Sequence, residues 1–180
     1  ESLGRAKKKL LPDRIANFYP TVAQLQALYK LTGEAALVFS GAYMAEPFFR
    51  KVLEAAPGDA WALTALGRLA ADSGNGRKAE ELFNKAIAQK APLAFSYLSL
   101  GGFYMVRGQT DKALACLEGG GKRFPRDPDL ALALGQLYYS RARYADARRL
   151  LKPFSLPAYQ NAPQRQAVMR LLSRINEKIK

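Results

Sequence analysis

The sequence contains no histidine and only one cysteine among its 180 residues. Histidine is the commonest acid–base side chain of enzymes and the commonest metal ligand, so its absence excludes histidine-based catalytic triads and histidine-ligated metals. The single cysteine, Cys116, cannot form an internal disulfide bond, and there is no cysteine cluster that could hold zinc. The sequence therefore predicts neither a metal site nor a bound cofactor.

Long apolar runs and acidic residues are also scarce. The longest apolar candidate, residues 130–139, is about half the ~20 residues that a membrane-spanning helix needs, so no transmembrane helix is predicted. There are 15 Asp and Glu residues against 28 Lys and Arg residues, which gives a formal net charge of +13. Apolar residues make up 49% of the sequence, an ordinary fraction for a globular protein. We expect a soluble globular protein, of the cytoplasm or, in a bacterium, of the periplasm; composition does not decide the compartment.

The excess positive charge is concentrated near the C-terminus. Residues 141–180 carry ten basic and two acidic side chains, whereas residues 31–140 carry twelve and eleven. Because arginine pairs well with carboxylate and phosphate groups, this end of the chain favours acidic partners.

Glycine and alanine recur at a fixed interval of 34 residues. Glycines stand at 33, 67, 101 and 135, and alanines stand at 45, 79, 113 and 147. Between them the apolar residues follow a helical spacing, as at Tyr97, Leu100 and Tyr104. Glycine inside a helix costs about 1 kcal/mol relative to alanine, so its recurrence calls for a packing reason. We expect helical hairpins in which the glycine lets the second helix approach closely, with the small alanine as its matching surface.

These registers resemble the tetratricopeptide repeat family, whose 34-residue unit favours leucine at position 7, glycine at 8, tyrosine at 11 and alanine at 20. Position 7 is Leu66, Leu100 and Leu134 in three units, and position 11 is Tyr104 and Tyr138 in two of them. The resemblance implies an all-α solenoid of about four hairpins, wound as a right-handed superhelix. The units would be 26–59, 60–93, 94–127 and 128–161, followed by a capping helix at 162–180. Residues 1–25 would be either an N-terminal cap or the remnant of a preceding repeat.

The resemblance also implies a concave face, lined by the first helix of each unit, on which partners bind. Its most exposed positions give an apolar wall in the third unit, flanked by aromatic residues, a composition typical of protein interfaces. The candidate partner-binding residues are Trp61, Thr64, Arg68, Phe95, Leu98, Met105, Leu132, Gln136 and Tyr139. Arg170 and Arg174 would edge this groove if the last helix continues the same register. The alternative is a tightly curled superhelix whose own helices cover some of these side chains.

One known site of the family is not expected here. Its clamp for the carboxylate tails of chaperones needs five polar or basic residues, of which this chain has only Lys30. The other four positions are Glu34, Ala65, Phe95 and Ser99. Binding of chaperone tails is therefore not carried over from the resemblance.

The remaining motifs have simple interpretations. Cys116 is expected to be a half-buried structural thiol, and the neighbouring acids Glu80 and Glu81 are expected on a solvated helix face. The run of three glycines at 119–121 and the following lysine lack the strand and the Ser/Thr of a phosphate-binding loop, so we interpret them as the frayed end of a helix.

The sequence thus predicts a non-enzymatic scaffold that binds a peptide or helix of a protein partner in its groove, with acidic groups at the basic end. A larger bacterial secretion or export assembly is one setting in which such repeats are common. The alternative is a basic solenoid that binds nucleic acid. The net charge favours it, but cations and aromatic side chains do not interleave along one repeated position, as base stacking would require. The partner's identity and the oligomeric state stay open.

Overall fold

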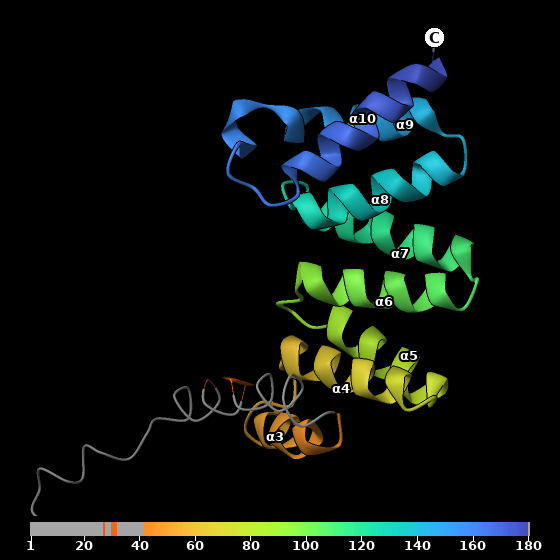
Figure 1. The fold of residues 1–180 in the computed structure, drawn as a ribbon. Coiled ribbons are helices and arrows are strands. Elements are labelled where there is room, and N and C mark those ends of the chain that lie inside the picture. Colours follow the sequence, from red (N-terminus) through yellow and green to blue (C-terminus); the bar gives the residue numbers. More distant parts are fainter. Residues whose placement is uncertain (1–26, 28–29, 32–41, 180) are drawn as a thin grey trace, which may run out of the picture.

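A computed structural model describes residues 27, 30–31 and 42–179, and the structural statements below concern these residues. Within them, eight α-helices follow one another, and two short 3-10 helices lie near the C-terminal end (Figure 1). The predicted all-α fold is confirmed for this part of the chain. The segment 1–25, with its predicted cap or repeat remnant, lies outside the described residues, as does Gly33.

The helices pack as consecutive hairpins. Helix α3 (Ala42–Ala55) comes first, and the three hairpins that follow are α4 (Ala60–Asp72) with α5 (Gly76–Ile87), α6 (Ala94–Val106) with α7 (Thr110–Arg123), and α8 (Pro128–Ser140) with α9 (Tyr144–Leu151). The chain then passes through two 3-10 helices, Lys152–Ser155 and Pro157–Tyr159, to α10 (Arg165–Ile179). Figure 1 shows the hairpins stacked in chain order, with α3 and α10 at opposite ends. This arrangement is the predicted solenoid.

Local sequence signals explain where several helices begin. The Asp59 side chain accepts a hydrogen bond from the backbone N–H of Ala62 at 2.9 Å, and Asp127 accepts one from Leu130 at 2.8 Å. Each aspartate thereby satisfies one of the N–H groups that a helix start leaves without an intrahelical partner. Pro128 follows in the first turn of α8, where its missing N–H costs little.

The recurring glycines explain how closely the two helices of a hairpin approach. A Cβ atom placed on the glycine would lie within 2.9 Å of a partner side chain in three units: Gly67 against Phe83, Gly101 against Leu117, and Gly135 against Leu151. Real Cβ atoms essentially never come that close, so the packing reason inferred from the sequence is confirmed. The nearest side chain is, however, the bulky residue four positions after the recurring alanine. The alanine itself is fully buried, as at Ala79, Ala113 and Ala147.

The three glycines at 119–121 do not fray their helix. Helix α7 continues through them to Arg123, and Gly120 is buried. A Cβ atom on Gly120 would lie 2.8 Å from Cβ of Tyr97 and 3.1 Å from Cδ2 of Leu130. The predicted frayed end is therefore wrong, because packing against α6 and α8 holds the helix despite the low helix propensity of glycine.

Helix α10 covers the last hairpin. Its apolar face buries Val168, Leu171 and Ile175 against a cluster that includes Leu151 and Phe154. An amphipathic terminal helix of this kind closes the core of an open stack, since terminal repeats need a polar outer face. Among the helices of the described ranges, none combines the length and the apolar character needed to cross a membrane.

Candidate partner-binding surface

Helices α4, α6, α8 and α10, with Leu117 of α7, line three adjoining hollows on one face of the stack. The first hollow is lined by Arg68, Phe95, Leu98, Ser99, Asp129, Leu132, Ala133 and Gln136. The second shares Leu98, Ala133 and Gln136 with the first and adds Gly102, Met105, Leu117, Leu137 and Ser140. The third shares Gln136 and adds Tyr139, Ala167, Arg170, Leu171 and Arg174. Because Gln136 belongs to all three, they form one continuous surface, which we call the α4–α10 groove.

The middle of the α4–α10 groove is apolar and open to solvent. Phe95 is 37% exposed and Met105 is 44% exposed, and Leu98 and Leu132 are half-buried beside them. Exposed apolar side chains that gather in a hollow are one mark of a protein-binding site. The apolar wall expected in the third unit is thus accessible in this structure.

Arginines stand over two of the aromatic rings that line this groove. The Arg68 guanidinium lies 5.6 Å from the centre of the Phe95 ring, and the Arg174 guanidinium lies 4.9 Å from that of Tyr139. These distances are typical of cation–π contacts. Each ring therefore has one face occupied by a side chain of the protein itself, which leaves less free surface for stacking a nucleobase.

Trp61 is not among the residues that line these hollows. Its ring packs edge-on against Phe49, with 5.0 Å between ring centres, and the Lys30 ammonium lies 5.5 Å from the ring centre. Lys30 also forms an ion pair with Asp59 at 2.6 Å. In the described residues, Trp61 joins α4 to the elements before it instead of extending the α4–α10 groove.

Thr64 is fully buried, so its predicted place on the partner-binding face is wrong. Its hydroxyl donates to the backbone carbonyl of Ala60 at 2.6 Å and lies 2.6 Å from the hydroxyl of Ser96, which is also fully buried. With the Thr64 proton committed to Ala60, Ser96 acts as the donor between the two hydroxyls. The pair joins α4 to α6. A threonine between apolar residues carries no signal that distinguishes this role from a ligand contact.

Thr64→Val should lower the free energy of unfolding by about 1–3 kcal/mol, because it leaves the buried Ser96 hydroxyl without its acceptor. Ser96→Ala should cost less, about 1 kcal/mol, because Thr64 still donates to Ala60. Urea denaturation of both variants measures the difference. Equal losses, or a larger loss for Ser96→Ala, would contradict this direction of the hydrogen bond.

Cys116, the single cysteine of the chain, lies on α7. Burial raises the pKa of the Cys116 thiol to about 11, and the thiol donates to the backbone carbonyl of Tyr97 at 3.5 Å. Cys116 is half-buried, as expected from the sequence, and a thiol with a raised pKa is a poor nucleophile at neutral pH. Within the described residues, no group of three or more acidic or cysteine side chains could hold a metal ion.

Glu80 is partly exposed on its helix, in line with the prediction, and it also has specific partners. It accepts a hydrogen bond from the Tyr104 hydroxyl at 2.8 Å and lies 3.3 Å from the Lys112 ammonium. These contacts, led by the tyrosine hydroxyl, lower the pKa of Glu80 although partial burial opposes them. Burial and then the bond to Glu80 raise the pKa of Tyr104 to about 12. Glu81, by contrast, is exposed and pairs with Lys85 at 2.7 Å.

Comparison with known proteins agrees with this architecture. The family model described as "Tetratricopeptide repeat" matches residues 44–100 and 104–172. The chain is similar to solved structures of pilF from Pseudomonas aeruginosa (19% identity, covering 88% of this chain and 70% of that chain, TM-score 0.70). It is also similar to TTC0263, a thermophilic protein from Thermus thermophilus (20% identity, 86% and 82%, TM-score 0.61), and to MamA of AMB-1 (19%, 86% and 82%, TM-score 0.59).

At these identities the likeness to solved structures shows the fold alone. Among curated proteins, none matches the chain. The family model nevertheless matches well over half of the chain, over the same helices that stack as hairpins around the recurring glycines. The chain belongs to the tetratricopeptide repeat family.

Proposed function

We propose that this protein is a non-enzymatic scaffold that binds a segment of a protein partner in the α4–α10 groove. The observation that supports this most is the continuity of the groove, in which an open apolar middle leads to a basic end on α10. Tetratricopeptide repeat domains generally act as protein-interaction scaffolds, and an extended groove across several repeats suits a peptide or a helix.

The apolar middle would supply most of the affinity. Phe95, Leu98, Met105 and Leu132 offer aromatic, aliphatic and thioether surface, which a partner removes from water on binding. This contribution depends little on salt. It would appear mainly in the rate at which the complex dissociates.

The basic end would select partners with acidic groups. Arg170 and Arg174 are exposed on α10, and residues 141–180 carry ten basic and only two acidic side chains. Exposed charges of this kind steer association and are screened by salt. The partner segment we propose therefore has an apolar stretch followed by carboxylates.

The experiment begins with affinity capture by the intact chain and identification of the captured proteins by mass spectrometry. With the captured partner, Phe95→Ala combined with Leu98→Ala should raise the dissociation rate about tenfold or more, which corresponds to about 1.4 kcal/mol. Reversal of Arg170 and Arg174 to glutamate should slow association and flatten its salt dependence. Reversal of Lys90 and Lys122, which are exposed and do not line the groove, changes the net charge equally and should have little effect.

The opposite result would favour another site. If the double alanine variant folds and binds normally while reversal of the arginines abolishes binding at every salt concentration, the groove is not the main site.

The net charge of +13 supports a second candidate, binding of nucleic acid through the basic end. Titration with random RNA and DNA across a range of salt concentrations tests it. Membership of a bacterial secretion or export assembly is a further proposal, and the identity of the captured proteins decides it.

A further inference from the structure

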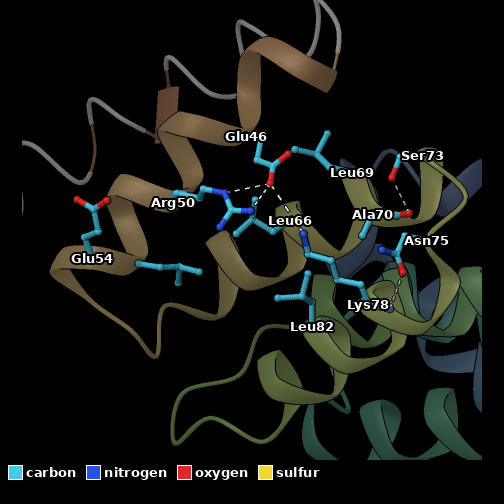
Figure 2. A pocket seen from close by; sticks show the side chains of 11 residues that line it. Glu46, Arg50, Glu54, Leu66, Leu69, Ala70, Ser73, Asn75, Lys78 and Leu82 are labelled. Atoms are coloured by element: carbon cyan, nitrogen blue, oxygen red, sulfur yellow. Dashed lines mark hydrogen bonds and ion pairs between the residues drawn. The ribbon is translucent and has the colours of Figure 1, made fainter.

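A separate crevice of about 680 Å³ lies between α3 and α5, with α4 as its floor. Figure 2 shows its side chains: Leu66, Leu69 and Leu82 form apolar walls, and Glu46 and Lys78 approach each other across the opening. The crevice shares no lining residue with the α4–α10 groove. It belongs to the side of the stack formed by the second helices of the hairpins.

The repeat shows what occupies the corresponding place one unit later. Ala70, which lines the crevice, stands 34 residues before Tyr104. The Tyr104 side chain is only 7% exposed, its hydroxyl donates to Glu80 at 2.8 Å, and the Lys112 ammonium lies 5.3 Å from the ring centre. A tyrosine therefore fills the interface between the α4–α5 hairpin and the α6–α7 hairpin. It is held there between a carboxylate and a cation.

The next interface surrounds its tyrosine with the same kinds of groups, although Glu118 and Arg143 do not stand at the repeat positions of Glu80 and Lys112. The Tyr138 hydroxyl donates to Glu118 at 2.8 Å, and the Arg143 guanidinium lies 4.3 Å from the ring centre. Two consecutive interfaces thus use a tyrosine whose hydroxyl donates to a glutamate of the preceding second helix. The ring of each contacts a cation in the first turn of the following second helix (Lys112) or directly before that helix (Arg143).

At the interface between α3 and the α4–α5 hairpin, the carboxylate and the cation are present but the tyrosine ring is absent. Glu46 and Lys78 stand 34 residues before Glu80 and Lys112, and both line the crevice. Their charged atoms are 4.0 Å apart, against 3.3 Å for the later pair. Arg50 donates to Glu46 at 3.0 Å and holds the carboxylate at the opening. Where the ring would stand, the chain carries only the methyl group of alanine.

We propose that this crevice binds a tyrosine side chain of a protein partner. The partner's ring would take the place that Tyr104 takes in the following repeat, with its hydroxyl donating to Glu46. The charges of the crevice complement that ligand, since a carboxylate suits the phenol hydroxyl and the Lys78 ammonium suits the ring face. The volume lies in the range of small-ligand sites and leaves room for atoms beside the ring.

The first test uses N-acetyl-tyrosinamide and N-acetyl-phenylalaninamide as probes of the full chain, followed by amide chemical shifts in NMR spectra. We expect the tyrosine probe to shift the amides of Leu66, Leu69 and Ala70, and to bind several-fold more tightly than the phenylalanine probe. Glu46→Leu removes the hydroxyl's acceptor and should abolish this preference. Equal binding of both probes to the unmodified protein, or no shifts in the crevice, would overturn the proposal.

The second test fills the crevice from within. Ala70→Tyr supplies the missing ring, and we expect it to abolish binding of the tyrosine probe and to raise the melting temperature. Asp72→Tyr places a tyrosine at an exposed position of the same helix and should leave probe binding unchanged. Continued binding to Ala70→Tyr, or a variant that cannot accommodate the ring and unfolds, would show that the crevice does not fit tyrosine. Crevice shifts that appear with protein concentration alone would identify a second copy as the occupant and overturn the partner proposal.

Discussion

Gly101→Leu is expected to lower the free energy of unfolding by about 3 kcal/mol, the upper end of ordinary overpacking costs. A Cβ atom on Gly101 alone would lie 2.8 Å from Cγ and Cδ2 of Leu117, and leucine adds three more carbons at the same place. Because Leu117 is itself 4% exposed and enclosed, α6 and α7 would have to separate to admit the new side chain. Thermal and urea denaturation measure the loss.

The adjacent glycine provides a matched control. Gly102 lies in the same helix, is exposed, and has no heavy atom within 4 Å of its Cβ position. Gly102→Leu should therefore be neutral or stabilise the protein by about 0.5–1 kcal/mol, because leucine has the higher helix propensity. Similar losses in both variants would show that glycine acts here through the backbone. An unchanged melting temperature for Gly101→Leu would contradict the close contact with Leu117.

Phe83→Ala is expected to cost about 3–5 kcal/mol, the range for removing a buried aromatic side chain. Phe83 is 1% exposed; its ring lies against Gly67 and is centred 5.7 Å from the ring of Phe103. Phe83→Leu is the conservative control, since leucine stands at this position in the next two units, as Leu117 and Leu151. It should cost less than about 1.5 kcal/mol.

Phe83→Ala also tests how far a local loss of stability spreads along the solenoid. In a stack of repeats each unit contacts only its neighbours, so stability is close to a sum of local terms. Amide hydrogen exchange in Phe83→Ala should therefore lose most protection in α4, α5 and α6, and least in α10. A uniform loss of protection would show instead that the described helices unfold as a single cooperative unit.

The crevice between α3 and α5 could not be predicted from the residue at position 70 alone. The alanine at Ala70, where two other units have tyrosine, is visible in the sequence. An alanine there is equally compatible with a closed interface, because neighbouring helices can move inward to fill a small gap. Only the relative positions of three helices show that the space is open and that Glu46 and Lys78 face it.

The α4–α10 groove was more predictable, because the side chains that line it lie on exposed faces fixed by the helical period. Phe95, Leu98 and Leu132 line one hollow as expected, and Arg170 and Arg174 join it through α10. Thr64 follows the same register but is buried, because α6 brings Ser96 against it. Exposure at such a position depends on the angle between hairpins, which residue spacing does not contain.

By itself, the sequence determined the all-α class, the hairpin as its unit and the use of glycine as the point of closest approach. These features follow from contacts within about 34 residues, where helical periodicity and side-chain size leave few alternatives. The tertiary structure alone decided that α7 continues through Gly120, that Thr64 is buried, and that the groove is continuous while the crevice at Ala70 is open. Each of these depends on how one hairpin packs on the next, because burial and volume are properties of several helices at once.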